Sequence, residues 1–175
     1  MTEIAVIGAG LAGCVVANDL SKTASVKVYE KSSRPGGRMA TRVVSRHQFD
    51  HGAQFFDATS PDFKSFLKPL LENGCVARWD PRFAEFDGPK LIRQTRWSDS
   101  HPHYVGKPTM SSFVDKLSNN LDCVFEIKVA SIERQGERWV LYDTEGSRLG
   151  DYDWVILTAP AEQTYQLLPN GVDFK

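Results

Sequence analysis

Three glycines near the start of the chain have the spacing of a phosphate-binding loop. The segment reads Gly8-Ala9-Gly10-Leu11-Ala12-Gly13, a G-x-G-x-x-G pattern. In such a loop the first glycine permits a tight turn, the second lets the backbone approach a pyrophosphate, and the third lets a helix pack closely on a strand. The N–H groups of a helix that begins at Leu11 and Ala12 would face the anion. Because the pattern recurs by chance, its surroundings decide its meaning.

An acidic residue follows at the place that this chemistry requires. The apolar run Ile4–Ile7 predicts a strand buried on both faces, Leu11–Leu20 a helix, and Val26–Glu30 a second strand. Glu30 can accept hydrogen bonds from the ribose hydroxyls of an adenine dinucleotide. Its charge disfavours the 2′-phosphate of NADP, although the neighbouring Lys31 weakens that argument. A glycine-rich turn that binds no ligand would not need this acid, so we predict a dinucleotide-binding site. At this point either FAD or NAD could be the dinucleotide.

A second glycine-rich loop, Arg34-Pro35-Gly36-Gly37-Arg38, comes next. Two adjacent glycines after a proline fit neither a helix nor a strand interior. With the preceding motif, this loop resembles the amine-oxidase-like superfamily of FAD-dependent oxidoreductases, whose members carry a G-G-R loop after the ribose-binding acid. The resemblance implies FAD, with Gly36 and Gly37 close to it and Arg38 near its phosphate oxygens. A solvated turn is the plainer alternative.

Further segments extend the likeness, which is nearest to the renalase group of that superfamily. Phe49–Phe56 resembles the family segment beneath the flavin ring and implies Gly52, Ala53 and Gln54 around the isoalloxazine. The backbone of Val129 matches the position that meets the adenine, and Thr158–Pro160 matches a strand end near the cofactor. We also place Lys31 with the cofactor-binding residues. The resemblance implies hydride transfer from a small-molecule substrate to FAD and reoxidation by dioxygen.

The chain departs from the family in length. Relatives continue for about as long again, and they carry a late Gly-Asp motif and most of the substrate lobe there. We therefore assign no catalytic residue. Two alternatives stay open: a truncated, non-catalytic dinucleotide-binding module, and an NAD-binding dehydrogenase domain. Loss of a final sheet strand would expose an edge, so we expect self-association or pairing with a missing C-terminal half.

These patterns predict an α/β protein with a Rossmann-like FAD/NAD(P)-binding fold, a parallel sheet and a small inserted β/α lobe on the substrate side. We expect the FAD-binding domain at 1–58 and 122–175 and the lobe at 59–121. Other expected elements are helices over Pro61–Leu71, with Ser60 as N-cap, and Thr109–Leu121; small antiparallel strands within Cys75–Tyr104; strands Val124–Phe125, Ser131–Gln135 and Trp139–Asp143; and a buried strand Tyr152–Thr158. We interpret Trp79, Phe86 and Trp97 as core aromatics.

Composition narrows the function further. The net charge is −1, which gives no field that favours nucleic acid or a membrane surface. No stretch is long and apolar enough for a spanning helix, and the three cysteines are too few and too far apart for a disulfide framework. We expect free thiols and a cytoplasmic location. His47 and His51 lie in a segment whose sequence predicts extended backbone, where their spacing does not converge on one ion, so no metal site is expected.

Overall fold

The computed structural model describes residues 1–96 and 99–169. They form two compact units, one of Met1–Met39 together with the chain from Val114 onward, the other of Ala40–Phe113. The first unit is thus discontinuous in sequence, and the glycine-rich loops belong to it. The domain limits expected at 58 and 121 stay a prediction, and the last residues of that prediction, 170–175, lie outside the described residues.

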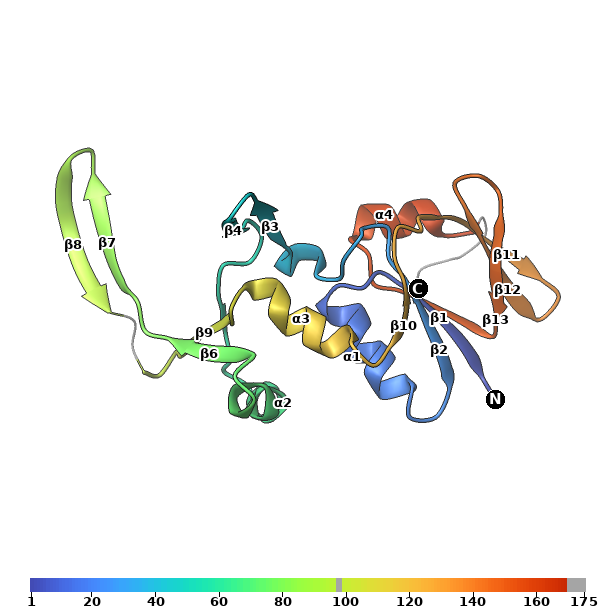
Figure 1. Ribbon diagram of the computed structural model, residues 1–175, viewed down its shortest axis with the longest axis horizontal. Coiled ribbons are helices and arrows are strands. Elements are labelled where there is room, and N and C mark those ends of the chain that lie inside the picture. Colours follow the sequence, from blue (N-terminus) through green and yellow to red (C-terminus); the bar gives the residue numbers. More distant parts are fainter. Residues whose placement is uncertain (97–98, 170–175) are drawn as a thin grey trace. The chain divides into compact units, whose positions relative to one another are not determined.

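The first unit is built on a parallel sheet with the strand order β10-β2-β1-β14 (Figure 1). The strands are β1 (Glu3–Ile7), β2 (Ser25–Tyr29), β10 (Asp122–Val124) and β14 (Trp154–Leu157). Helix α1 (Leu11–Leu20) connects β1 to its parallel neighbour β2, the crossover that such a pair needs. The predicted strand, helix and strand are confirmed, and Glu30 lies just beyond β2 rather than inside it.

Both faces of this sheet are covered. On one face, α1 contacts β1 and β2 and buries Cys14 and Ala17. On the other, Ala5, Ile7 and Tyr29 pack against an antiparallel sheet of β11 (Val129–Gln135), β12 (Arg138–Asp143) and β13 (Arg148–Tyr152). Burial on two faces explains the lack of polar alternation in β1. The result is the Rossmann-like α/β fold that the sequence predicts, completed by α3 (Met110–Ser118) and α4 (Ala161–Leu167).

The second unit consists of short antiparallel strands and one helix. β3 (Thr41–Val44) pairs with β4 (His47–Asp50), β9 (His103–Gly106) lies between β5 (Phe56–Asp57) and β6 (Val76–Trp79), and β7 (Arg82–Asp87) pairs with β8 (Lys90–Arg96). Helix α2 (Pro61–Glu72) begins after Ser60, whose hydroxyl accepts from the Phe63 N–H at 3.2 Å. This helix, its N-cap and the antiparallel strands are confirmed. Stacked and tilted rings of Phe56, Phe63, Phe66 and Phe113 fill the interior.

Several features differ from the sequence prediction. The strand expected at Val124–Phe125 is β10, Asp122–Val124, and Phe125 lies outside it. Helix α3 ends at Ser118, not Leu121, because the following Asn119 and Asn120 are poor helix formers. The run Tyr152–Thr158 is divided: Tyr152 ends β13 and Trp154 begins β14. The hairpin β3–β4, the strand β13 and the helix α4 were not predicted, since none shows a strong apolar period.

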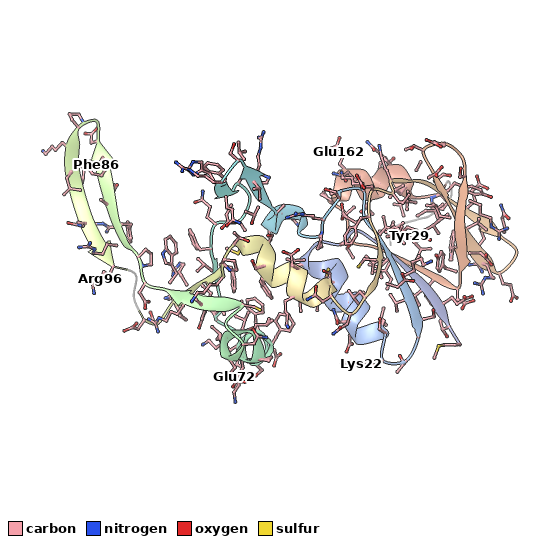
Figure 2. The ribbon with its side chains drawn as sticks, viewed as in Figure 1. Lys22, Tyr29, Glu72, Phe86, Arg96 and Glu162 are labelled. Atoms are coloured by element: carbon pink, nitrogen blue, oxygen red, sulfur yellow. The ribbon has the colours of Figure 1, made fainter. Side chains whose placement is uncertain are left out.

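The interpretation of the aromatics as core residues was wrong where the structure describes them. Phe86 is 62% exposed and Trp79 38% exposed. Phe86 lies on the β7–β8 hairpin (Figure 2), which as a two-stranded ribbon has no second layer of its own to bury a ring. Trp97 lies outside the described residues. Among the helices that the structure describes, none has the length and apolarity to cross a bilayer.

Candidate dinucleotide-binding site

The turn after β1 needs glycine at two of its three motif positions. Gly8 has φ of +108°, and a Cβ there would lie 2.8 Å from the Thr158 Oγ1. A Cβ on Gly13 would lie only 1.9 Å from the carbonyl oxygen of Gly8. The tight turn and the close helix–strand approach that the motif predicts are therefore both present. The fold itself requires these two glycines, whether or not a ligand binds.

Gly10 is different, because the fold leaves it room for a side chain. Its φ of −75° and ψ of −179° suit any residue, and a Cβ would have the Gly37 Cα at 4.0 Å as its nearest neighbour, an ordinary contact distance. Gly10 is the N-cap of α1 and supplies no side-chain cap, and the first turn contains no acidic residue. The first-turn N–H groups, at Leu11 and Ala12, have no carbonyl one turn earlier in the helix. The positive end of α1 can thus receive an anion.

The Glu30 carboxylate lies next to this helix start. It is 8% exposed, and its Oε2 accepts from the Ala9 N–H at 2.8 Å while its Oε1 accepts from the Ser32 N–H at 2.9 Å. The main chain of Glu30 is fixed too, since its N–H donates to the Val124 carbonyl at 2.9 Å. Each carboxylate oxygen has a second lone pair left for a ribose hydroxyl. The acid and the glycine-rich turn are therefore one site.

The Gly36-Gly37 pair packs against this turn. The Gly36 N–H donates to the Ala9 carbonyl at 2.9 Å, and Gly10 and Gly36 form a parallel bridge. Gly37 has φ of +52°, and a Cβ on it would lie 3.3 Å from the Gly10 Cα. The two glycine-rich segments thus lie side by side, which their sequence separation did not reveal.

Two cations of the predicted site are neighbours of its residues in the sequence: Lys31 follows Glu30, and Arg38 follows Gly37. The Lys31 ammonium donates to the Gln163 Oε1 on α4 at 2.9 Å. Arg38 is exposed in a short 3₁₀ helix, Gly37–Met39, and forms no ion pair with the residues that the structure describes. Arg38 is thus a cation close in sequence to the anion site and not already neutralised there.

The remaining predicted site residues are divided between the two units: Val129 belongs to the first, and Gly52, Ala53 and Gln54 belong to the second. Val129 begins β11 with 4% exposure, two residues after Ile127, whose N–H donates to the Glu30 carbonyl at 3.0 Å. Gly52, Ala53 and Gln54 belong to the second unit, in the loop between β4 and β5. The Asp50 Oδ1 before that loop accepts from the Thr41 hydroxyl at 2.6 Å and from the Met110 N–H at 3.2 Å. Asp50 thus anchors the end of β4 to the start of α3.

Sequence reasoning missed two contributors to the site. Thr158 was matched only as part of a strand end, yet its hydroxyl donates to the Ile7 and Gly8 carbonyls, both at 3.0 Å. Gln163, the partner of Lys31, lies on a helix that was not predicted. No local spacing rule finds either residue, because both are far from the glycine-rich turn in the sequence.

The thiol nearest the site is not a nucleophile. Cys14 is completely buried in α1, and its thiol donates to the Ala9 carbonyl at 3.6 Å. Burial raises the pKa of the Cys14 thiol to about 12, with smaller contributions from Cys123 and Glu30. It therefore stays protonated at neutral pH. The described residues contain no group of three or more His, Cys, Asp or Glu side chains placed to hold a metal ion.

Comparisons with known proteins agree with this geometry. Residues 6–70 match the family model of the NAD(P)-binding Rossmann-like domain. Prenylcysteine oxidase 1-like of Homo sapiens is 38% identical over 72 residues, and that of Mus musculus 39% over 72 residues. Each alignment covers 39% of this chain but only 14% of the relative.

A solved structure extends the likeness to almost the whole fold. The putative protoporphyrinogen oxidase from Exiguobacterium sp. 255-15 aligns with a TM-score of 0.73 over 97% of this chain and 62% of its own, at 13% sequence identity. At that identity the match shows the fold alone. The chain therefore has a Rossmann-like dinucleotide-binding fold that it shares with proteins named as oxidases, and it spans less than two thirds of their length.

Proposed function

We propose that the chain binds FAD and forms the dinucleotide-binding part of a flavin-dependent oxidoreductase of the amine-oxidase type. The observation that carries this proposal is Gly10, a glycine that the fold does not require, at an uncapped helix start beside the Glu30 carboxylate. A ligand that needs close backbone approach gives a reason for glycine there. An anionic pyrophosphate linked to a ribose has the chemistry that these groups bind.

The residues at hand fit such a ligand. The N–H groups at the start of α1 would hold the pyrophosphate, with the Arg38 guanidinium as a further cation. Glu30 would accept from the ribose hydroxyls through its free lone pairs, and the backbone near Val129 would meet the adenine. The same carboxylate opposes a 2′-phosphate, and Lys31, which could offset it, hydrogen-bonds Gln163 instead. FAD or NAD is thus favoured over NADP.

The adjoining G-G-R loop favours FAD within that pair. Its packing against Gly10 supports the expectation, from resemblance to the amine-oxidase-like proteins, that this loop contacts the cofactor. Gly52, Ala53 and Gln54 would then surround the isoalloxazine. A bound FAD would supply two-electron redox chemistry, which we propose to be hydride transfer from a small-molecule substrate with reoxidation by dioxygen. The free thiols of Cys14, Cys75 and Cys123 fit a reducing, cytoplasmic setting.

Equilibrium dialysis of the full chain against FAD, NAD⁺ and NADP⁺, with a visible absorbance scan, tests the proposal. We expect uptake of FAD and a flavin spectrum. Binding of NAD⁺ alone would support a dehydrogenase domain instead, and binding of none of the three would reject a dinucleotide site. Stopped-flow reduction of the bound flavin by amines or dihydronicotinamides separates an enzyme from a non-catalytic module, because only the former shows saturable reduction.

The variant Glu30→Gln tests the assigned role of the acid. We expect FAD affinity to fall roughly 10- to 100-fold, since a charge-assisted bond to a hydroxyl is worth about 1.5–3 kcal/mol. The matched control is Glu137→Gln, on the exposed turn between β11 and β12. Isothermal titration calorimetry measures both. Equal affinity of Glu30→Gln and the wild type would remove Glu30 from the site.

A further inference from the structure

One peptide group in the glycine-rich turn is held at both of its ends by side chains. The N–H of the Gly8–Ala9 peptide donates to the Glu30 Oε2 at 2.8 Å. The carbonyl of the same peptide accepts from the Thr158 hydroxyl at 3.0 Å. Since a peptide group is planar, fixing its two ends fixes its orientation. The turn therefore depends on a hydroxyl group as well as on the carboxylate.

The Thr158 hydroxyl also fills the space that two glycines leave. A Cβ on Gly8 and a Cβ on Gly13 would each lie 2.8 Å from the Thr158 Oγ1. The same hydroxyl donates to the Ile7 carbonyl, at 3.0 Å, which already accepts from the Thr158 N–H. The two glycines and this threonine are thus one packed unit at the carboxyl ends of β1 and β14.

Charge explains why this contact bears on ligand binding. The carbonyls of Ile7 and Gly8, at the end of β1 and in the turn that leads into α1, carry partial negative charge, which is unfavourable for a neighbouring anion. The Thr158 hydroxyl shares its one proton between these two oxygens, which reduces their charge and supports the turn in which Gly8 has φ of +108°. Removing the hydroxyl would leave the peptide held only through its N–H, by Glu30, and would take this donor away from the two oxygens.

From these contacts we infer that Thr158 is a positioning residue, which sets the orientation of the Gly8–Ala9 peptide and through it the affinity of the turn for a pyrophosphate. The inference rests on the proposed FAD site. Thr158 itself touches backbone rather than ligand.

The test compares three variants of the full chain. Thr158→Val keeps the shape and removes the hydroxyl, and Thr158→Ser keeps the hydroxyl. The matched control, Thr164→Val, removes the hydroxyl of a threonine on α4 that donates to the Ala159 carbonyl at 3.0 Å rather than to the Gly8–Ala9 peptide. By calorimetry we expect Thr158→Val to bind FAD roughly tenfold more weakly, with Thr158→Ser and Thr164→Val near the wild type.

A second measurement does not depend on a ligand. Amide hydrogen exchange at Ala9, followed by NMR in the free protein, should be roughly tenfold faster in Thr158→Val and unchanged in the other two variants. If the wild type binds no FAD, the proposed function fails, while this exchange result still decides whether Thr158 orients the Gly8–Ala9 peptide. Wild-type exchange at Ala9 in a folded Thr158→Val protein would overturn it. Should Thr158→Val not fold, Thr158→Ala provides the same comparison.

Discussion

The three glycines of the G-x-G-x-x-G segment are surrounded by different groups. Gly13 faces the Gly8 carbonyl, Gly8 faces the Thr158 hydroxyl, and Gly10 has only the distant Gly37 Cα near it. A motif read from sequence treats them alike. Their neighbours divide them into two that shape the turn and one that leaves it open toward a ligand.

Alanine substitutions should separate these roles. Gly10→Ala should cost about 1 kcal/mol or less in stability, the ordinary penalty at an N-cap, yet weaken FAD binding by tenfold or more because the methyl group occupies the approach to α1. Gly13→Ala should cost more than about 4 kcal/mol or prevent folding, because its Cβ overlaps backbone. Thermal unfolding and calorimetry measure both effects. A Gly10→Ala protein that binds FAD like the wild type would contradict the assigned role.

Spacing alone predicted the residues of the site that are near one another in sequence. Gly8, Gly13 and Glu30 belong to one β-α-β unit, whose geometry fixes their separation. The contact of Thr158 with the turn could not be predicted, because the two are far apart in the sequence and only the tertiary fold brings the Thr158 hydroxyl to the Gly8 carbonyl. The packing of Gly36 on Gly10 could not be predicted either, because a loop has no regular hydrophobic spacing that would indicate where its backbone runs.

At the scale of elements, two buried tyrosines join the parallel sheet to the antiparallel one. The hydroxyl of Tyr29, on β2, donates to the Leu149 carbonyl at 3.1 Å, so the Tyr152 hydroxyl, 2.7 Å away, is the donor between the two rings (Figure 2 labels Tyr29). Their rings meet edge to face at 6.3 Å. Tyr29 directly precedes Glu30, so this pair helps to fix the end of β2.

Removing both hydroxyls together should therefore destabilise the fold by less than the sum of removing each one alone. We expect Tyr29→Phe to lose about 1–3 kcal/mol, because it strands the buried Tyr152 hydroxyl and the Leu149 carbonyl. The double variant Tyr29→Phe, Tyr152→Phe should lose less than the sum of the single ones. Urea unfolding of the four proteins gives the coupling. Strict additivity would show that the two hydroxyls act independently.

The Tyr29–Tyr152 pair should also make the stability of the native state depend on pH. Burial, assisted by the Tyr29 hydroxyl, raises the pKa of Tyr152 above its ordinary 10.0. The native state then keeps a proton that the unfolded chain loses, so its stability falls as pH rises above about 10. Tyr152→Phe should show a shallower fall in the same urea experiment.

Elements with a strong apolar period were predicted, and those with polar or short sequences were not. β1, α1 and α2 follow from their patterns, and the antiparallel character of the region from β6 to β9 was inferred from aromatic residues between turn residues. β13 contains Arg148 and Asp151 among few apolar residues, so its pairing with β12 was not visible locally. Exposure of Phe86 could not be predicted either, because it depends on what packs against a hairpin rather than on the strand itself.

At the scale of the molecule, the parallel sheet ends on an uncharged strand. β14 reads Trp154-Val155-Ile156-Leu157, it is the last strand in the order among the described residues, and Trp154 is 64% exposed. Proteins usually protect such an edge with charge, proline or a covering segment, because its free N–H and C=O groups pair with other strands. We therefore expect the association that the sequence predicted to occur through the exposed edge of β14.

Light scattering tests this surface. We expect the wild-type chain to form dimers or larger species as its concentration rises, and Trp154→Lys to reduce that association by placing a charge on the edge. Thr144→Lys, an equal charge change on the exposed turn after β12, is the control and should associate like the wild type. A wild-type chain that stays monomeric at every accessible concentration would contradict the prediction.

The position of β1 between β2 and β14 also has a consequence for biosynthesis. Ile7 lies opposite Tyr29 on one side and Leu157 on the other. On the ribosome the first partner emerges almost at once, whereas the second, followed by Thr158, emerges only after most of the described chain has been translated. Such long-range pairing is slow to form. The turn therefore acquires its ligand-ready shape only once β14 and Thr158 have been synthesised, and until then a nascent chain gains no help from the cofactor.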